Sequence, residues 1–430
     1  MADLWPKHWT RKKLGEIADV NWGDTSVTKA SYVATGYPAY SASGPDGFLP
    51  YADYNRTGIV LSAIGAECGR TWLVKGKWSC IKNTIRFWSI HPDVDTEFLY
   101  WLTCNPAIWP KRGSAQPFIS QSDARNLIVA YPPIQEQRAI AHILGTLDDK
   151  IELNRKMNET LEQMARAIFK SWFIDFEPVR AKMKGRWKKG QSLPGLPAHL
   201  YDLFPNELET SELGKVPKGW KIIRLGDILS EIVTGSRPKG GATEKGLPSL
   251  GAENVIGLGK YDFTKDKFIP RSYFEQLKQK GAIIKDGDIL LYKDGAQIGR
   301  KSYFDHGFPH SECAVNEHVF ILRSKYPFLQ RYLFFWLDQP WMTSEIINLN
   351  SNSAQPGINQ AGIIQLSILF PSEVIIKSFD QIIEPIITHI FSNCHETQKL
   401  TALRDTILPK LIHREIHIKD AEKFLQKEGL

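Results

Sequence analysis

The sequence predicts two pseudo-repeated α/β modules plus long α-helices, with the modules separated by an antiparallel two-helix coiled coil. Three observations predict this fold class: motifs that occur twice in the same order, a heptad pattern of about 40 residues in each half, and short strand-like runs between turn residues. The chain has 430 residues, of which 42% are hydrophobic and 23% are charged. These proportions are typical of globular proteins and argue against wholesale disorder.

Three motifs are repeated. Trp9 followed by Leu14-Gly15-Glu16-Ile17 returns as Trp220 followed by Leu225-Gly226-Asp227-Ile228. Gly65, Gly69 and Arg70 return as Gly295, Gly299 and Arg300, and Ser114-Ala115-Gln116-Pro117 returns as Ser353-Ala354-Gln355-Pro356. The offset grows from 211 residues (Trp9 to Trp220) to 239 residues (Ser114 to Ser353), so the second copy carries the longer loops. The chain is therefore an internal duplication.

The two modules are expected at 1–133 and 215–371. Runs such as Gly58-Ile59-Val60-Leu61 and Ile289-Leu290-Leu291-Tyr292 lie between Gly-, Pro- and Asp-rich turns, which is typical of short strands. Helical pieces are expected near Glu97 to Leu102 and near Pro327 to Leu337, before the third repeated motif. Each module is therefore a mixed α/β structure.

Each module is followed by a predicted long helix, at 134–173 and at 372–412. Apolar residues alternate at spacings of four and three, which is the seam of a coiled coil. At 1.5 Å per residue, 40 residues span about 60 Å. The seam residues are Ile140, Leu144, Leu147, Ile151, Asn154, Leu161 and Ile168 in the first helix and Phe379, Ile383, Ile386, Ile390, Asn393, Leu400 and Ile407 in the second.

A narrow apolar seam cannot be buried by one helix alone, so the two helices are expected to bury each other. Asn154 and Asn393 occupy matched seam positions. They are interpreted either as a device that fixes the pairing register or as polar residues tolerated near the helix middle. Pro409 is expected to kink or fray the last turns of the second helix.

The remaining segments are a predicted linker at 174–214 and a tail at 413–430. The linker has basic residues from Arg180 to Lys189, followed by prolines and acidic residues. It has no repeat partner except the tail. Both segments have zero formal charge, and the two helices are at 0 and −1.

The surplus of positive charge lies on the modules. The first has 14 Lys and Arg against 11 Asp and Glu, and the second has 20 against 15. These surpluses of +3 and +5 account for the whole chain's +7, since the helices contribute −1. Basic modules joined by near-neutral helices are the pattern expected when the modules contact DNA phosphates.

The motifs resemble the specificity subunit of type I restriction–modification systems. The resemblance covers nearly the whole chain and rests on the repeated motifs, on Pro132-Pro133-Ile134-x-Glu136-Gln137 before the first helix, and on the segment Phe173 to Met183. The segment Ser211 to Trp220 and the closing helix from Leu403 to Ile412 are also similar to the family. The second copy departs from the family pattern at Pro371-Ser372-Glu373-Val374, because it lacks the fuller Pro-Pro-x-x-Glu-Gln form.

The resemblance implies a non-catalytic DNA-reading subunit. Each module would be a target-recognition domain that reads one half of a bipartite, asymmetric site in double-stranded DNA. The helix pair would set the spacer between the half-sites and dock two methyltransferase subunits, and restriction and translocation subunits would join that core. This chain would bind no cofactor, whereas the partners would use S-adenosylmethionine, ATP and Mg²⁺.

Candidate DNA-binding residues come from two kinds of loop. Arg70 and Arg300 in the shared glycine loops are expected to contact phosphate or to form structural salt bridges. Gln116 and Gln355 are interpreted either as readers of adenine edges or as scaffold turns. Unmatched loops are expected to hold the base readers, and the candidates there are Lys29, Arg56, Arg237, Lys239, Lys245 and Lys293.

Enzyme and metal signatures are weak. Asn105-Pro106-Ala107-Ile108-Trp109 lacks the second proline of the amino-methyltransferase motif, and His306, His310, Cys313 and His318 lack the spacing of a zinc site. Five scattered Cys without a C-x-x-C pair and the absence of long apolar runs predict a cytoplasmic protein without a membrane segment. The alternatives to the specificity subunit are a stand-alone enzyme that modifies or cleaves DNA and a coiled-coil scaffold that does not bind DNA.

Overall fold

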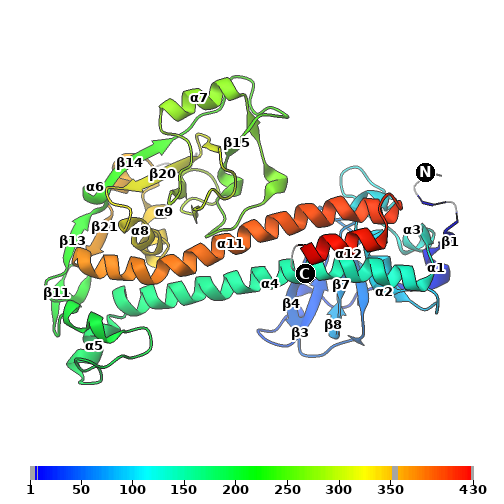
Figure 1. Ribbon diagram of the computed structural model, residues 1–430, viewed down its shortest axis with the longest axis horizontal. Coiled ribbons are helices and arrows are strands. Elements are labelled where there is room, and N and C mark those ends of the chain that lie inside the picture. Colours follow the sequence, from blue (N-terminus) through cyan, green and yellow to red (C-terminus); the bar gives the residue numbers. More distant parts are fainter. Residues whose placement is uncertain (1–4, 7, 351–356, 428–430) are drawn as a thin grey trace. The chain divides into compact units, whose positions relative to one another are not determined.

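The computed structural model describes residues 5, 6, 8–350 and 357–427, without the side chains of 422 and 424–427. The chain divides into two compact units: Met1–Ile151 with Lys399–Leu430, and Glu152–Gln398. Helix α4 (Ile134–Phe173) and helix α11 (Glu373–Ile412) each begin in one unit and end in the other. The predicted fold class is confirmed, since each unit holds one α/β module and an antiparallel stretch of the two long helices (Figure 1).

The first unit contains a four-stranded antiparallel sheet in the order β2-β9-β6-β7 and a second sheet in the order β4-β3-β8-β5. Strands β1 and β10 form a separate antiparallel pair. In chain order its module consists of β1 (Thr10–Lys13), α1 (Leu14–Ile17), β2 (Ala18–Trp22), a 3₁₀ helix (Lys29–Ser31), β3 (Tyr37–Ser41), β4 (Gly44–Leu49), β5 (Tyr54–Asn55), β6 (Gly58–Ser62), β7 (Thr71–Val74), β8 (Lys77–Cys80), β9 (Thr84–Ser89), α2 (Thr96–Thr103), α3 (Gln121–Arg125) and β10 (Ile128–Tyr131).

The second unit repeats this plan. Its four-stranded sheet has the order β14-β20-β17-β18, its second sheet the order β16-β15-β19, and β13 pairs with β21. The elements of this module are β13 (Lys221–Arg224), α6 (Leu225–Ile228), β14 (Leu229–Thr234), β15 (Leu247–Leu250), β16 (Phe268–Ile269), α7 (Arg271–Gln279), β17 (Ile289–Tyr292), β18 (Lys301–Tyr303), β19 (Ala314–Val315), β20 (Val319–Ser324), α8 (Leu329–Leu337), α9 (Pro340–Asn348), α10 (Gln360–Ile364) and β21 (Ser367–Phe370).

The repeated Leu-Gly-acid-Ile motif forms the short helix α1 in one module and α6 in the other. The Leu14 amide donates to the Leu127 carbonyl at 2.8 Å, and the Leu225 amide donates to the Leu366 carbonyl at 2.8 Å. A Cβ at Gly15 would lie 3.0 Å from Cβ of Arg125, and one at Gly226 would lie 3.0 Å from Cβ of Ile364. Both glycines therefore allow close packing of this helix on the short helix before the last strand.

The second sheets differ between the modules. Both contain a parallel pair, with Ala39 beside Ser79 in β3 and β8 and Ser249 beside Ala314 in β15 and β19. The first module adds β4 and β5 to this pair, whereas the second adds β16 and the helix α7. The repeat thus preserves the four-stranded sheet and varies the sheet beside it.

The long helices pack antiparallel in both units. In the first unit, Arg404 of α11 donates to Asp148 of α4 at 2.5 Å, and Arg414 pairs with Glu136. In the second, Asn154 donates to Glu396 at 2.7 Å. The residue number on one helix falls as the other rises, as an antiparallel register requires.

The seam residues differ in burial. Ile140, Leu144 and Leu147 are buried in the first unit with Leu400 and Ile407, and Phe379, Ile383 and Ile390 are buried in the second. Ile151, Leu161, Ile168 and Ile386 are half-buried. Helix α11 extends past Pro409 to Ile412, contrary to the expected fraying, because Leu411 and Ile412 are buried in the first unit's core.

Asn154 and Asn393 occupy matched positions of the repeat but do not bond to each other. Asn154 Nδ2 donates to Glu396, while Asn393 Nδ2 donates to Oδ1 of Asn158 at 2.9 Å. Asn158 also donates to the Ile390 carbonyl at 3.1 Å. The polar part of the seam is therefore a set of cross-helix hydrogen bonds, which penalise a shifted register.

The segment 174–214 is folded, although its composition predicted a linker. It contains α5 (Glu177–Met183) and most of a hairpin formed by β11 (Leu208–Ser211) and β12 (Gly214–Pro217). Trp187, Leu200 and Phe204 are buried in the core of the second unit. The tail likewise contains a helix, α12 (Ile418–Lys427). These segments show little helical or strand periodicity in sequence, but burial of a few large apolar side chains stabilises their folded structure.

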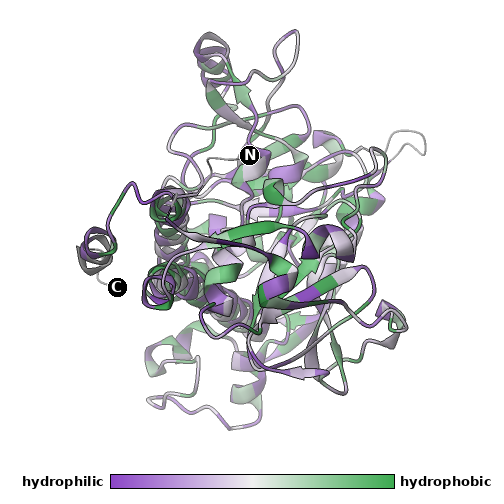
Figure 2. Ribbon diagram, turned by 90° about the vertical axis from the view of Figure 1, so that its right-hand side faces the viewer, coloured by the Kyte–Doolittle hydropathy of each residue, from purple (hydrophilic) through white to green (hydrophobic). Residues whose placement is uncertain are grey.

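No helix in the described ranges is both long and apolar enough to cross a lipid bilayer. Figure 2 shows hydrophilic as well as hydrophobic residues on the long helices.

Lys301 in β18 is a buried cation whose replacement is expected to stabilise the second unit. Burial lowers the pKa of its ammonium group to about 8, and Nζ donates to Oγ1 of Thr343 at 2.6 Å. The folded state therefore binds this proton more weakly than the unfolded chain, and this costs stability at neutral pH. Lys301→Met should raise the free energy of unfolding by about 1–3 kcal/mol at pH 7.

The gain should shrink above the folded pKa, because a neutral lysine carries no burial penalty for its charge. Urea unfolding of both proteins at pH 7 and pH 10 measures this. An equal gain at the two pH values would show that packing, not charge, is responsible.

Candidate nucleic-acid interface

The shared glycine loops have the same geometry in both modules. In the first, the Ser62 amide donates to the Arg70 carbonyl at 2.8 Å and the Gly69 amide to the Ser62 carbonyl at 2.9 Å. In the second, the Tyr292 amide donates to the Arg300 carbonyl at 2.9 Å and the Gly299 amide to the Tyr292 carbonyl at 3.0 Å. Gly69 has φ +93° and Gly299 has φ +87°, a conformation that favours glycine.

Each loop presents an exposed arginine at its end. The Arg70 guanidinium lies 3.0 Å from the Glu67 carboxylate and 5.5 Å from the centre of the Trp72 ring. Arg300 is exposed as well. An exposed guanidinium in a rigid loop is suited to a phosphate contact, and the local Glu67 pair is of the weak surface kind.

The Ser-Ala-Gln-Pro motif supports the glycine loop of the first module. The Gly65 amide donates to the Pro117 carbonyl at 3.0 Å, and the Ile119 amide donates to the Ala63 carbonyl at 2.8 Å. Gln116 itself is exposed. In the second module, Ile358 donates to the Lys293 carbonyl at 2.8 Å, whereas Gln355 lies outside the described residues. These backbone bonds favour the scaffold interpretation of the motif.

Lys29 belongs to a polar cluster around Asp46. The Asp46 carboxylate pairs with Lys29 and accepts from Ser41 at 2.7 Å and from Tyr32 at 2.8 Å. Partial burial opposes ionisation, but these three donors lower the pKa of Asp46 below its ordinary value. Lys29 is therefore engaged with Asp46, and a DNA contact would have to share or replace that pair.

Arg56 lies on an aromatic cluster. Its guanidinium carbon lies 4.5 Å from the centre of the Trp88 ring, and that of Arg86 lies 4.1 Å from the same ring. Arg86 is mostly buried and donates to Asp19 at 2.7 Å, so its role is structural. Arg56 is exposed and remains the candidate for contact with a ligand.

The candidates of the second module lie in two places. Arg237, Lys239 and Lys245 are exposed in the loop between β14 and β15, where Arg237 pairs with Glu317 at 3.0 Å. Tyr273 of α7 bonds to Ser236 at 2.7 Å and to the Arg237 carbonyl at 2.8 Å, which fixes the start of this loop. Lys293 is half-buried, with Nζ 4.9 Å from the centre of the Phe320 ring.

The four residues considered for zinc do not converge. His310 lies 3.1 Å from Asp266, His318 lies 2.7 Å from Asp294, and Cys313 is fully buried. Among the residues that the structure describes, no group of three or more metal-ligating side chains comes together. These histidines therefore belong to separate local pairs.

Comparison with known proteins decides the family. The model of the type I restriction modification DNA specificity domain matches residues 6–163 and 217–402. The chain belongs to this family. Each match contains one module and most of the helix that follows it, so the specificity domain occurs twice.

Specificity subunits of known type I restriction enzymes are similar over nearly the full length. The MjaIX subunit of Methanocaldococcus jannaschii is 26% identical over 96% of this chain and 95% of the relative. The HindI subunit of Haemophilus influenzae is 27% identical over 83% and 86%. The fold matches the S subunit of a type I system from M. genitalium, with a TM-score of 0.59 and 16% identity over 96% of this chain and 99% of that one.

This chain is therefore a specificity subunit, a class of non-catalytic components of type I complexes. The glycine loops that both modules share belong to the scaffold. The other exposed candidate cations lie in loops that differ between the two specificity domains. Sequence reasoning missed Asp46 and Arg86, because their partners are distant in the chain.

Proposed function

We propose that this specificity subunit reads a bipartite, asymmetric site in double-stranded DNA, with one half-site for each α/β module. The observation that carries this proposal is the combination of a repeated four-stranded sheet with a second sheet that differs. Repetition of the scaffold places two readers in one chain. Variation of the second sheet and its loops gives the two readers different surfaces, as an asymmetric site requires.

Phosphate contacts are assigned to the exposed cations of the modules. Arg70 and Arg300 end matching loops, and Arg56, Lys239 and Lys245 are exposed in unmatched ones. Lys239 and Lys245 form no ion pair with any residue in the described ranges. Cations of this kind release counterions from DNA, so affinity should fall steeply as salt rises.

The long helices are assigned a second role. Under this proposal they set the spacer between the half-sites and dock two methyltransferase subunits, which restriction and translocation subunits then join. The relatives are named as specificity subunits of restriction enzymes, which supports an assembly of this kind. S-adenosylmethionine, ATP and Mg²⁺ would be used by the partners, and the complex would act in the cytoplasm.

Exchange of one module tests the reading of separate half-sites. Residues 215–371 are replaced by the matching module of another family member, and the complex with the methyltransferase subunit is assayed by methylation mapping. We expect one half-site to change and the other to persist, because the two modules have separate sheets and cores. The reciprocal exchange of residues 1–133 is the control. Loss or change of both half-sites in either hybrid would contradict modular reading.

A further inference from the structure

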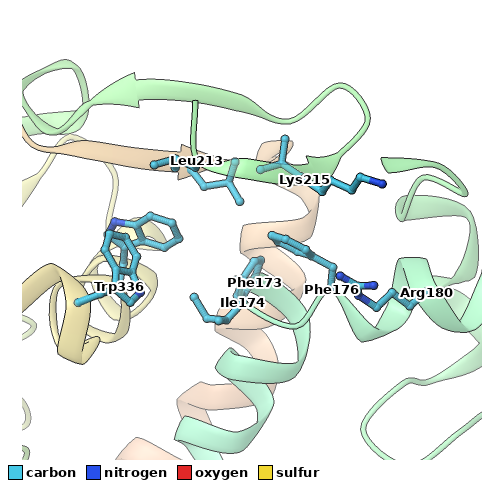
Figure 3. Close-up of a pocket in the computed structure, with 10 residues that line it drawn as sticks. Phe173, Ile174, Phe176, Arg180, Leu213, Lys215 and Trp336 are labelled. Atoms are coloured by element: carbon cyan, nitrogen blue, oxygen red, sulfur yellow. The ribbon is translucent and has the colours of Figure 1, made fainter. Parts of the chain in front are cut away.

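A pocket of about 390 Å³ lies where helix α4 ends, outside the loops assigned to DNA (Figure 3). Its walls come from the end of α4, the start of α5, the hairpin β11–β12, and the tryptophans of α8 and α9. Phe173, Phe176 and Trp336 are buried and form its apolar interior. The pocket lies wholly within the second unit.

Two large apolar side chains remain exposed at the pocket. Leu213 at the turn of the hairpin is 39% exposed, and Trp341 at the start of α9 is 37% exposed. Trp341 stands edge-on to Trp336, with ring centres 5.2 Å apart. Exposed tryptophan and leucine around an apolar pocket are typical of surfaces that a partner covers.

The same pocket carries positive charge. Arg180 and Lys215 line it, and Figure 3 shows both side chains beside the apolar residues. Lys215 is exposed and forms no ion pair within the part of the chain that the structure describes. Arg180 Nε donates to the Asp175 carbonyl at 2.8 Å, which holds the guanidinium at the pocket without neutralising it.

The surrounding segment strengthens this charge. Six of the ten residues from Arg180 to Lys189 are Lys or Arg, and none is acidic. Arg186 and Lys189 have carboxylate partners in Glu177 and Asp202. Arg180 and Lys215 form no ion pair with a carboxylate of the described residues, so they are available to an acidic ligand.

We propose that this pocket docks an acidic segment of a partner protein, with an aromatic or leucine-sized side chain in the pocket and carboxylates against Arg180 and Lys215. The inference rests on the proposed function, under which the partner is the methyltransferase subunit. Duplex DNA would satisfy the cations but has no projecting apolar group to fill the pocket. A peptide can supply carboxylates to the two cations and an apolar side chain to the interior of the pocket.

Glutamate substitutions at the exposed rim of the pocket test the proposal. Leu213→Glu and Lys215→Glu change exposed side chains of the hairpin, so both variants should fold. With purified full-length chain and purified methyltransferase subunit, we expect each variant to bind the subunit at least tenfold more weakly than wild type. Lys218→Glu, on the same hairpin segment but outside the pocket, is the matched control and should bind as wild type does.

DNA binding by the same variants separates the possible outcomes. Unchanged affinity of the variants for DNA, with weakened binding of the methyltransferase subunit, supports the docking site. If wild type binds the subunit and the variants bind it equally well, this proposal is overturned while the proposed function stands. If the variants lose DNA affinity instead, the pocket serves DNA and the proposal is overturned. If wild type does not bind the subunit at all, the proposed function fails together with it.

Discussion

Removal of one heptad from each long helix is expected to shorten the unread spacer of the DNA site by about three base pairs. Seven residues of helix span about 10.5 Å, and one base pair occupies about 3.4 Å. The proposal assigns the distance between the modules to the helix pair, so a shorter pair should bring the half-sites closer. The half-sites themselves should be unchanged, because both modules keep their sheets and loops.

The antiparallel register decides which residues to remove. Asp148 contacts Arg404 and Asn154 contacts Glu396, so residues 147–153 of α4 lie opposite residues 398–404 of α11 within their respective units. Removing both segments preserves the heptad phase and the hydrogen bonds of Asn158 and Asn393. Methylation mapping with the methyltransferase complex measures the spacer.

Deletion of residues 147–153 alone is the control. It keeps the apolar seam but displaces one helix by about two turns against the other on one side of the deletion, so matched side chains such as Asn158 and Asn393 or Asp148 and Arg404 can no longer all meet. Specific methylation should therefore be abolished rather than show a new spacer. If the double deletion methylates sites with the original spacer, the helices do not set that distance.

Long periodic elements were the part of the fold that the sequence predicted well. The expected helices at 134–173 and 372–412 differ from α4 and α11 by at most one residue, because prolines precede both and the apolar seam persists through four or more heptads. The duplication could also be predicted from the sequence, since the repeated motifs mark the same turns in both modules. Local patterns repeated many times carry the most information.

Contacts between residues that are far apart in the sequence could not be predicted from it. Trp172 bonds to the Gly195 carbonyl at 3.3 Å, and this type of contact folds the segment expected to be a linker. Lys29 was selected as a DNA candidate because it lies in a loop that is not matched between the modules, yet it pairs with Asp46, which is 17 residues further along the chain. Lys301 and Arg323 are buried cations, and no periodicity distinguishes them from surface ones.

Replacement of Arg323 by methionine is expected to lower the free energy of unfolding of the second unit by about 3–5 kcal/mol at pH 7. Arg323 is mostly buried in β20, and all five of its guanidinium N–H groups are used. Nε and Nη2 donate to the two oxygens of Asp288 at 2.7 Å each, and Nη1 donates to Glu231 at 2.7 Å. Carbonyls of Gly281 and Ile283 accept the remaining two, at 3.0 and 2.7 Å.

The cost arises mainly at Asp288, which is buried and would lose the one cation that forms an ion pair with it among the described residues. Burial already raises the pKa of this carboxyl, and the bidentate contact with Arg323 opposes that effect. In the variant, burial outweighs the remaining hydrogen bond from the Lys285 amide and the charge of Lys285, so the pKa of Asp288 rises further and the carboxyl takes up a proton at higher pH in the folded state than in the unfolded chain. Stability of the variant should therefore recover as the pH falls through that folded pKa.

Urea unfolding from pH 7 to pH 5 measures both effects. The double variant Arg323→Met with Asp288→Leu removes the buried charge as well as its partner, so it should recover much of the loss. A deficit in Arg323→Met that is independent of pH, and that persists in the double variant, would place the cost in the hydrogen bonds to Gly281 and Ile283. The comparison thus separates charge compensation from backbone anchoring at the centre of a module whose neighbouring loops are assigned to DNA.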